Sequence, residues 1–285
     1  MAANFSLFFV PELLTQLFHT PVYCELTARQ QLRYNQLYAA HINEQFSYFE
    51  RHVGNPISAA LLPVLTRLGH TALAERVGEL IDDEVRHQVQ FDKLNRRVFP
   101  EFYGDVENHF IRPSLVARWL MSWITRFPGR LPFLLWLALF FEEFSVHLSR
   151  TVLAAVENGT QLEPCFVEIH RGHLRDEEGH VRLYPDLIRA VVAVLSSRQR
   201  GLQGGLLKRV MREVLAPKRS GIAVLRQLVS EFPELQDRER TLTAAVRGLK
   251  DSPDFFQALF GPRSLPVTYG LFEEFPEFSW QGYRD

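Results

Sequence analysis

Hydrophobic residues recur along this chain at the three- and four-residue spacing of amphipathic helices. Four long helices are predicted on this basis, at about 27–51, 73–97, 131–157 and 164–196. The sequence contains no Asn-Gly hairpin turn and no sustained alternation with a period of two, which would indicate strands. The pattern therefore predicts an all-α fold.

The connections between the long helices differ in length. Residues 101–132 separate the second helix from the third and contain a short helix of their own at about 114–125, whereas the third and fourth are joined by a short link. Four helices with one long crossover connection are typical of a ferritin-like four-helix bundle. We expect a single domain over residues 1–285, with its core bundle at about 27–196 and a helical C-terminal extension at about 204–285.

Shorter helices are expected outside the bundle, at about 59–68, 206–215, 222–231 and 234–249. The first long helix is expected to end near Gly54-Asn55-Pro56, because glycine and proline break helices. The tail from Ser252 onward is rich in Phe and Pro, and we expect it to be irregular.

Composition excludes several classes of protein. Apolar residues make up 46% of the chain and charged residues 23%, values that exclude intrinsic disorder. The formal net charge of −1 lacks the basic excess of a nucleic-acid-binding protein. The longest strongly apolar run, 131–141, is too short to cross a bilayer. We therefore expect neither a nucleic-acid nor a membrane partner.

The cysteines and the N-terminal segment indicate the cellular compartment in which the protein is expected. Cys24 and Cys165 stand far apart, so neither a disulfide framework nor a thiolate metal site is expected. The apolar patch 4–10 has no Lys or Arg before it, which argues against a signal peptide. We expect a cytoplasmic protein.

Two Glu-x-x-His motifs carry the candidate chemistry. Glu84 and His87 lie on the second predicted helix, and Glu177 and His180 lie on the fourth. Residues three apart lie on the same face of a helix, so each pair can aim a carboxylate and an imidazole at one point. A single copy would be just as typical of a solvated helix surface as of a metal site. Two copies on two long helices indicate a metal site.

A di-metal site in such a bundle also takes one Glu from each of the other two helices. The first helix offers Glu44, and the third offers Glu142 and Glu143 directly after its apolar run. Charged residues there are costly unless they are paired or bound to metal, although such a run can also end where a helix emerges into water. Periodicity leaves the choice between Glu142 and Glu143 open.

Neighbours of the motifs extend the candidate site. His173 shares one helical stripe with Glu177 and His180 and would add a seventh donor. Asp83 and Asp176 precede the motif glutamates and are placed to orient a histidine of the facing helix, unless they are ordinary surface residues. Four carboxylates would neutralise two divalent cations, and oxygen and nitrogen donors favour iron or manganese over a cluster or structural zinc.

The remaining candidates are weaker. We interpret His41 and His170 as polar neighbours of the site rather than ligands. Four phenylalanines, Phe46, Phe140, Phe141 and Phe144, are candidates for a pocket wall, although Phe at helical spacing is also typical of a core.

Several of these segments resemble the p-aminobenzoate N-oxygenase family. They are residues 33–37, 43–45, 83–87, 141–145 and 173–180, within a resemblance that covers about 20–195. The string His-Leu-Arg-Asp-Glu-Glu-Gly-His at 173–180 is the most specific part.

The resemblance implies a di-iron monooxygenase with two iron ions, for which manganese could substitute, and O2 as co-substrate. Such an enzyme oxidises an amine nitrogen, typically that of an arylamine, through hydroxylamine and nitroso stages towards nitro in a biosynthetic pathway. The implied partners are a small-molecule amine and an external electron donor, either a reductase or a ferredoxin, and a homodimer is compatible with the family. The implied ligands are Glu44, Glu84, His87, Glu143, His173, Glu177 and His180. Glu143 is preferred to Glu142 because the residues that follow align without a gap.

Three other interpretations remain open at this point. They are another ferritin-like di-metal oxidase or hydroxylase acting on carbon, an iron storage or carrier protein, and a metal-free helical scaffold. The extra His173 argues against the first, and the long crossover and C-terminal extension argue against the second.

Overall fold

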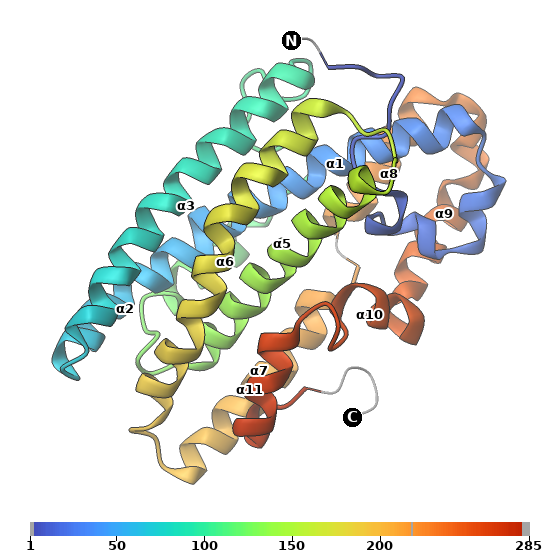
Figure 1. Ribbon diagram of the computed structural model, residues 1–285. Coiled ribbons are helices and arrows are strands. Elements are labelled where there is room, and N and C mark those ends of the chain that lie inside the picture. The colour runs from blue at the N-terminus through green and yellow to red at the C-terminus, as the bar shows by residue number, and fades with distance from the viewer. Residues whose placement is uncertain (1–2, 218, 281–285) are drawn as a thin grey trace.

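The computed structural model describes residues 3–217 and 219–280, without the side chains of 219 and 220. This part of the chain forms helices α1 to α11 and several short 3-10 turns, and it contains no β-strand (Figure 1). One isolated β-bridge joins Phe8 to Leu162. The all-α prediction is confirmed.

Four long helices lie side by side as the predicted bundle (Figure 1). They are α1 (Ala28–Phe49), α3 (Thr71–Val98), α5 (Phe133–Glu157) and α6 (Pro164–Val192). The long crossover between α3 and α5 contains α4 (Leu115–Ile124), as expected.

Side chains define where the bundle helices begin. Thr27 and Gln30 form a reciprocal capping box at the start of α1. At the start of α6, the Glu163 carboxylate accepts hydrogen bonds from the backbone N–H groups of Cys165 and Phe166, and Pro164 occupies the first helical position. These caps satisfy N–H groups that have no partner within the helix.

The first bundle helix does not end near Gly54, so that prediction is wrong. The chain passes through a π-helical segment, η4 (Glu50–Gly54), directly into α2 (Asn55–Arg67), and the three form one continuous helical run (Figure 1). Pro56 lacks a backbone N–H, but it stands in the first turn of α2, where proline is tolerated. Single π-helical turns are frequent at functional sites.

The C-terminal extension is helical throughout most of its described length. It contains α7 (Ser197–Leu215), α8 (Arg219–Glu231), α9 (Glu239–Gly248), α10 (Pro253–Phe260) and α11 (Pro266–Glu274). The expected irregular tail is therefore wrong. Pro253 and Pro266 each occupy the start of a helix, where their missing N–H has no cost, and Ser252 caps α10 by accepting from the backbone of Phe255.

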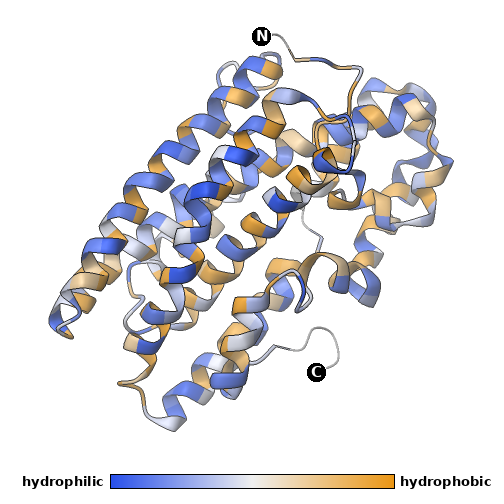
Figure 2. Ribbon diagram, viewed as in Figure 1, coloured by the Kyte–Doolittle hydropathy of each residue, from blue (hydrophilic) through white to orange (hydrophobic). Residues whose placement is uncertain are grey.

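The bundle and the extension share one hydrophobic core. Trp136 on α5 stacks on Phe272 of α11 at a ring-centroid distance of 5.3 Å and on Phe278 at 5.0 Å. Hydrophilic and hydrophobic residues alternate along α3 and α6, as expected for helices with one buried face (Figure 2). The shared core favours the predicted single domain of residues 1–285, which stays a prediction.

No helix in the described part of the chain is long and apolar enough to cross a membrane.

Candidate metal centre

Two groups of buried carboxylates and imidazoles meet in the middle of the bundle. One group consists of Glu50, His87, His173 and Glu177, and the other consists of Glu84, Glu142, Glu177 and His180. Within each group the donor atoms lie within 4.8 Å of one another. The donors come from α3, α5, α6 and the π-helical segment η4 that continues α1.

Glu177 belongs to both groups and lies between them. Its Oε1 lies 3.1 Å from His87 Nδ1 and 3.1 Å from His173 Nε2. Its Oε2 lies 3.4 Å from His180 Nδ1. Each oxygen of this carboxylate therefore faces a different group, which is the arrangement of a bridging ligand.

Most of the donor atoms are buried without a hydrogen-bond partner. Glu84, His173 and Glu177 are each 1% exposed. Both oxygens of Glu84 and of Glu177 lack a partner, as do Glu50 Oε2, His87 Nδ1, His173 Nε2 and His180 Nδ1. Buried polar atoms are normally hydrogen-bonded, so this concentration of unsatisfied acceptors at one place fits a pair of bound cations.

The second nitrogen of two imidazoles is held by an aspartate on the facing helix. His87 Nε2 on α3 lies 3.1 Å from Asp176 Oδ2 on α6, and His180 Nε2 on α6 lies 3.3 Å from Asp83 Oδ2 on α3. A carboxylate can only accept, so each Nε2 carries the proton and each Nδ1 presents its lone pair to the cluster. These are the two cross-helix contacts that the sequence suggested for Asp83 and Asp176.

His173 is held by packing. Its ring stacks on Phe46 at a centroid distance of 5.2 Å and meets Phe91 edge-on at 5.1 Å. Ser149 Oγ lies 3.5 Å from its Nδ1 and 3.1 Å from His170 Nδ1. His170 is thus a buried polar neighbour, as we interpreted it.

The structure brings together five of the seven predicted donors. Glu84, His87, His173, Glu177 and His180 lie in the two groups, whereas Glu44 and Glu143 do not. Their places are taken by Glu50 and Glu142.

Glu44 instead binds the crossover connection. Its carboxylate accepts hydrogen bonds from the backbone N–H groups of His109, Phe110 and Ile111 and from the Tyr103 hydroxyl. Burial raises the pKa of Glu44, and these hydrogen bonds oppose that shift. With four donors on its two oxygens, Glu44 is saturated and anchors residues 103–111 to the bundle.

Glu143 caps a helix of the C-terminal extension. Its Oε1 accepts from Val267 N at 2.5 Å and its Oε2 accepts from Thr268 N at 2.8 Å, in the first turn of α11. Burial raises the pKa of Glu143, opposed by these hydrogen bonds. A carboxylate at a helix N-terminus is favourable, so this residue fastens α11 to the bundle.

The sequence contained a signal for Glu50 that was missed. Glu50 lies four residues after Phe46 and three before Val53, both of which are buried, so it stands within the apolar stripe of its helix. A charged residue in such a stripe needs a partner. The π-helical turn that begins at this residue was not predictable from the spacing.

Electrostatics within the cluster also favours added positive charge. Burial, together with repulsion from Glu84 and Glu177, raises the pKa values of Glu50 and Glu142. Burial raises the pKa of Glu84 as well. Four carboxylates gathered out of water repel one another, and two divalent cations would neutralise them. Their oxygen and nitrogen donors suit iron or manganese.

Comparison with known protein families decides the assignment. The family model described as p-aminobenzoate N-oxygenase AurF matches residues 2–247. This chain belongs to the p-aminobenzoate N-oxygenase family. Searches of curated proteins and of solved structures gave no match.

Family membership confirms the resemblance drawn from the sequence motifs and establishes the chain as an N-oxygenase-family enzyme with a ferritin-like fold and a small amine as its substrate class. The matched region contains all seven residues of the two donor groups, whereas α10 and α11 lie beyond residue 247. Glu143 therefore binds an element outside the matched region.

Proposed function

We propose that this protein is a di-iron monooxygenase that oxidises the nitrogen of an arylamine through hydroxylamine and nitroso stages towards nitro, in a biosynthetic pathway. The proposed ligands of the two iron ions are Glu50, Glu84, His87, Glu142, His173, Glu177 and His180. Bound iron supplies the redox chemistry that activates O2; manganese could occupy the same donors.

The presence of His173 beside Glu50 and Glu177 carries this proposal. A ferritin-like di-iron site commonly has four glutamates and two histidines. This cluster has the same six donors and adds His173, whose Nε2 lies 3.1 Å from Glu177 Oε1 and 3.7 Å from Glu50 Oε1. A further imidazole makes the first group richer in nitrogen donors than the second, so the two ions would be inequivalent.

The surrounding residues hold the donors and exclude water. Asp83 and Asp176 fix the tautomers of His180 and His87. Tyr184, which is buried, donates to Glu142 Oε1 at 3.3 Å. These contacts keep the donors oriented before a metal ion arrives.

A very small cavity adjoins the carboxylates. It has a volume of about 10 Å³ and is bordered by Glu50, Glu142, Glu177, Ser145 and three phenylalanines. This is about the space that one water molecule needs. We place the small co-substrate O2 on this side of the cluster.

The reaction requires electrons from outside the protein. Each insertion of one oxygen atom from O2 into an N–H bond reduces the other atom to water and consumes two electrons and two protons. An external reductase or ferredoxin is therefore part of the proposal. His87 and His180 lie close to the surface on the α3–α6 face, because each contacts a partly exposed aspartate, Asp176 or Asp83. The exposed Arg86 lies 2.5 Å from Asp83 and 3.6 Å from Asp176.

A homodimer is the proposed assembly. α4 exposes Leu115, Val116 and Trp119 at 79%, 73% and 67%, and exposed apolar patches of this kind are typical of protein interfaces. Light scattering should give the molar mass of a dimer for the wild-type protein and that of a monomer for Trp119→Ser. A monomeric wild type would refute the dimer without affecting the metal site.

One experiment tests the enzyme proposal. The purified protein is loaded anaerobically with ferrous iron, supplied with a chemical reductant and exposed to ¹⁸O2 with an arylamine. We expect two iron ions per chain and ¹⁸O on the amine nitrogen. Oxygenation of carbon alone would support the hydroxylase alternative, many ions per chain would support storage, and absence of bound metal would support a scaffold.

A further inference from the structure

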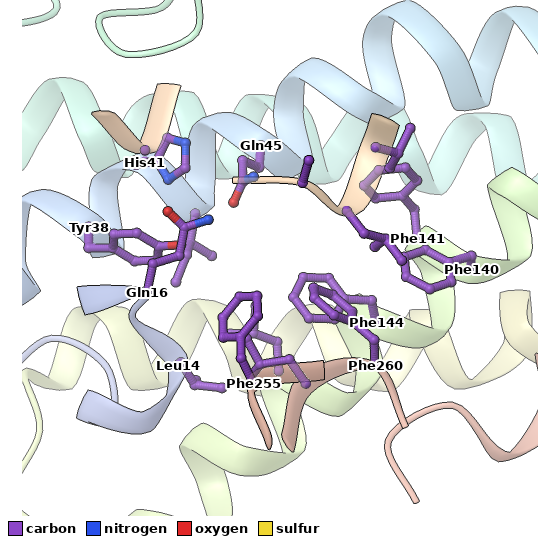
Figure 3. Close-up of a pocket in the computed structure, with 17 residues that line it drawn as sticks. Leu14, Gln16, Tyr38, His41, Gln45, Phe140, Phe141, Phe144, Phe255 and Phe260 are labelled. Carbon is purple, nitrogen blue, oxygen red and sulfur yellow. The ribbon is translucent and has the colours of Figure 1, made fainter. Parts of the chain in front are cut away.

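A second cavity lies between the bundle and the C-terminal extension (Figure 3). Its lining comes from α1, α5, α7, α8, α10 and the N-terminal segment that contains Leu14 and Gln16. Its volume is about 70 Å³. This is about half of the 150 Å³ cavity that is known to hold benzene in another protein, so even an occupant with a single ring requires the lining to move apart.

One end of this cavity is polar. His41, Gln45 and Gln16 lie there, close to Tyr38 (Figure 3). His41 is 1% exposed, and neither of its ring nitrogens has a hydrogen-bond partner. Gln16 Oε1 is also buried without a partner. Buried unsatisfied groups are costly, so these atoms point to a polar ligand that completes their hydrogen bonds.

The other end is aromatic and adjoins the metal centre. Phe140, Phe141 and Phe144 of α5 lie there, with Phe260 of α10 beside them (Figure 3). Phe141 also borders the small cavity at Glu50, Glu142 and Glu177. A ring whose polar substituent reaches His41 would therefore direct its opposite end towards the cluster.

Phe49 completes the wall between this cavity and the small cavity beside the carboxylates. It stacks on Phe141 at a centroid distance of 4.1 Å. Phe49 directly precedes Glu50, and Phe141 directly precedes Glu142. This aromatic pair and two of the proposed metal ligands, Glu50 and Glu142, thus come from the junction of α1 with η4 and from one turn of α5.

The absence of charge in the described lining limits which ring substituents the cavity can accept. None of the described side chains that line the cavity is a Lys, Arg, Asp or Glu. Burial lowers the pKa of His41 to about 3, so its imidazole is neutral at physiological pH and offers one donor and one acceptor. A carboxylate buried without a cation would be strongly disfavoured, whereas a hydroxyl or carboxamide would be satisfied.

Part of the wall is supplied from outside the family match. Phe255, Leu259 and Phe260 lie beyond residue 247, where the match ends. The shape of the cavity is therefore determined partly by this chain's own extension, and the family's named substrate does not fix what it accepts.

We propose that this cavity is the substrate pocket and selects a single-ring arylamine whose substituent opposite the amine is uncharged and hydrogen-bonding, with His41 as the residue that recognises it. This inference rests on the proposed N-oxygenase function. It excludes p-aminobenzoate, the anionic compound in the family's name, as the preferred substrate.

Binding tests the proposal without turnover. Calorimetric titration of the metal-free and the iron-loaded protein, kept anaerobic, uses p-aminobenzamide, p-aminobenzoate and unsubstituted aniline. We expect p-aminobenzamide to bind at least tenfold more tightly than p-aminobenzoate. Tighter binding of p-aminobenzoate, or equal binding of the two, would overturn the proposal.

Variants of His41 assign the recognition. His41→Leu should weaken p-aminobenzamide binding about tenfold, the value of one hydrogen bond, and leave aniline binding unchanged. His41→Gln, which keeps a donor and an acceptor, should retain most of the affinity. His147→Gln is the matched control, because His147 also has an unpartnered Nε2 but lines a different cavity.

The outcomes separate this proposal from the enzyme proposal. An equal loss of aniline and p-aminobenzamide binding in both His41 variants would indicate collapse of the cavity and would overturn recognition by His41. N-oxygenation with a preference for p-aminobenzoate would refute the pocket assignment alone. The expected binding pattern without any N-oxygenated product would refute the enzyme proposal alone.

Discussion

The imidazole of His87 on α3 is oriented by Asp176 on α6, with 3.1 Å between Nε2 and Oδ2. The reverse contact, from His180 on α6 to Asp83 on α3, has a length of 3.3 Å. Each helix of this pair therefore aligns a donor of the other. The two contacts make the metal centre depend on the packing of α3 against α6.

Removing one of these aspartates should weaken metal binding while leaving all seven donors in place. We expect Asp176→Ala or Asp83→Ala to lower iron affinity about 10–100-fold, because the histidine loses the partner that fixes its tautomer and orientation. Competition with a coloured chelator measures the affinity. Asp82→Ala, at the exposed neighbouring position, should have no effect. An unchanged affinity in Asp176→Ala would contradict the assigned role.

Glu50 and Glu44 should respond in opposite ways to the same substitution. Glu50→Gln removes a proposed ligand, so we expect iron content to fall from two ions per chain towards one. Glu44→Gln should keep both ions but lower the free energy of unfolding by about 1–3 kcal/mol, because the amide NH2 group faces N–H donors that it cannot satisfy.

Metal analysis and urea unfolding of the metal-free proteins distinguish the two. If Glu44→Gln lost iron and Glu50→Gln retained it, the ligand proposal would be wrong and the original sequence prediction right.

Glu143 should matter for α11 rather than for metal. In Glu143→Gln, one of the two N–H groups, of Val267 or Thr268, loses its acceptor. We expect amide hydrogen exchange in 266–274 to accelerate while iron content stays at two per chain. Glu142→Gln is the matched comparison and should lose iron without this local change. Protection of α11 that is insensitive to Glu143 would count against the capping role.

His41 should make the protein less stable in acid. Its pKa is about 3 in the folded state and near 6.5 in the unfolded chain, so the unfolded state binds a proton that the folded state does not. Stability is therefore fully present above about pH 6.5 and falls as the pH drops towards 3. Between pH 7 and pH 5 this one group costs about 2 kcal/mol.

Urea unfolding of the metal-free protein at the two pH values measures this cost. In His41→Leu the loss of stability between pH 7 and pH 5 should be smaller by about that amount. His70→Leu, at an exposed position, controls for removal of a histidine. An equal loss in wild type and His41→Leu would show that His41 titrates normally.

Much of the centre could be predicted because it follows helical geometry. The Glu-x-x-His spacing places Glu84 with His87, and Glu177 with His180, whatever the rest of the fold does. The same reasoning found His173 and the two aspartates. The long connection before α5 was sufficient to indicate the bundle topology.

The positions of Glu44 and Glu143 depend on tertiary contacts, which the spacing of residues along a helix does not predict. Glu44 is saturated by backbone groups of a crossover whose path the sequence does not reveal. Glu143 is committed to α11, more than 120 residues away. Glu50 faces the cluster from a π-helical turn, where the ordinary 100° step between residues no longer applies.

The most direct measurement of the central claim is an anomalous X-ray difference map, recorded at the iron absorption edge from crystals of the iron-loaded protein. The account predicts two peaks, one on either side of Glu177, the first beside His87 and His173 and the second beside His180. A single peak, no peak, or peaks bound to Glu44 or Glu143 would contradict it.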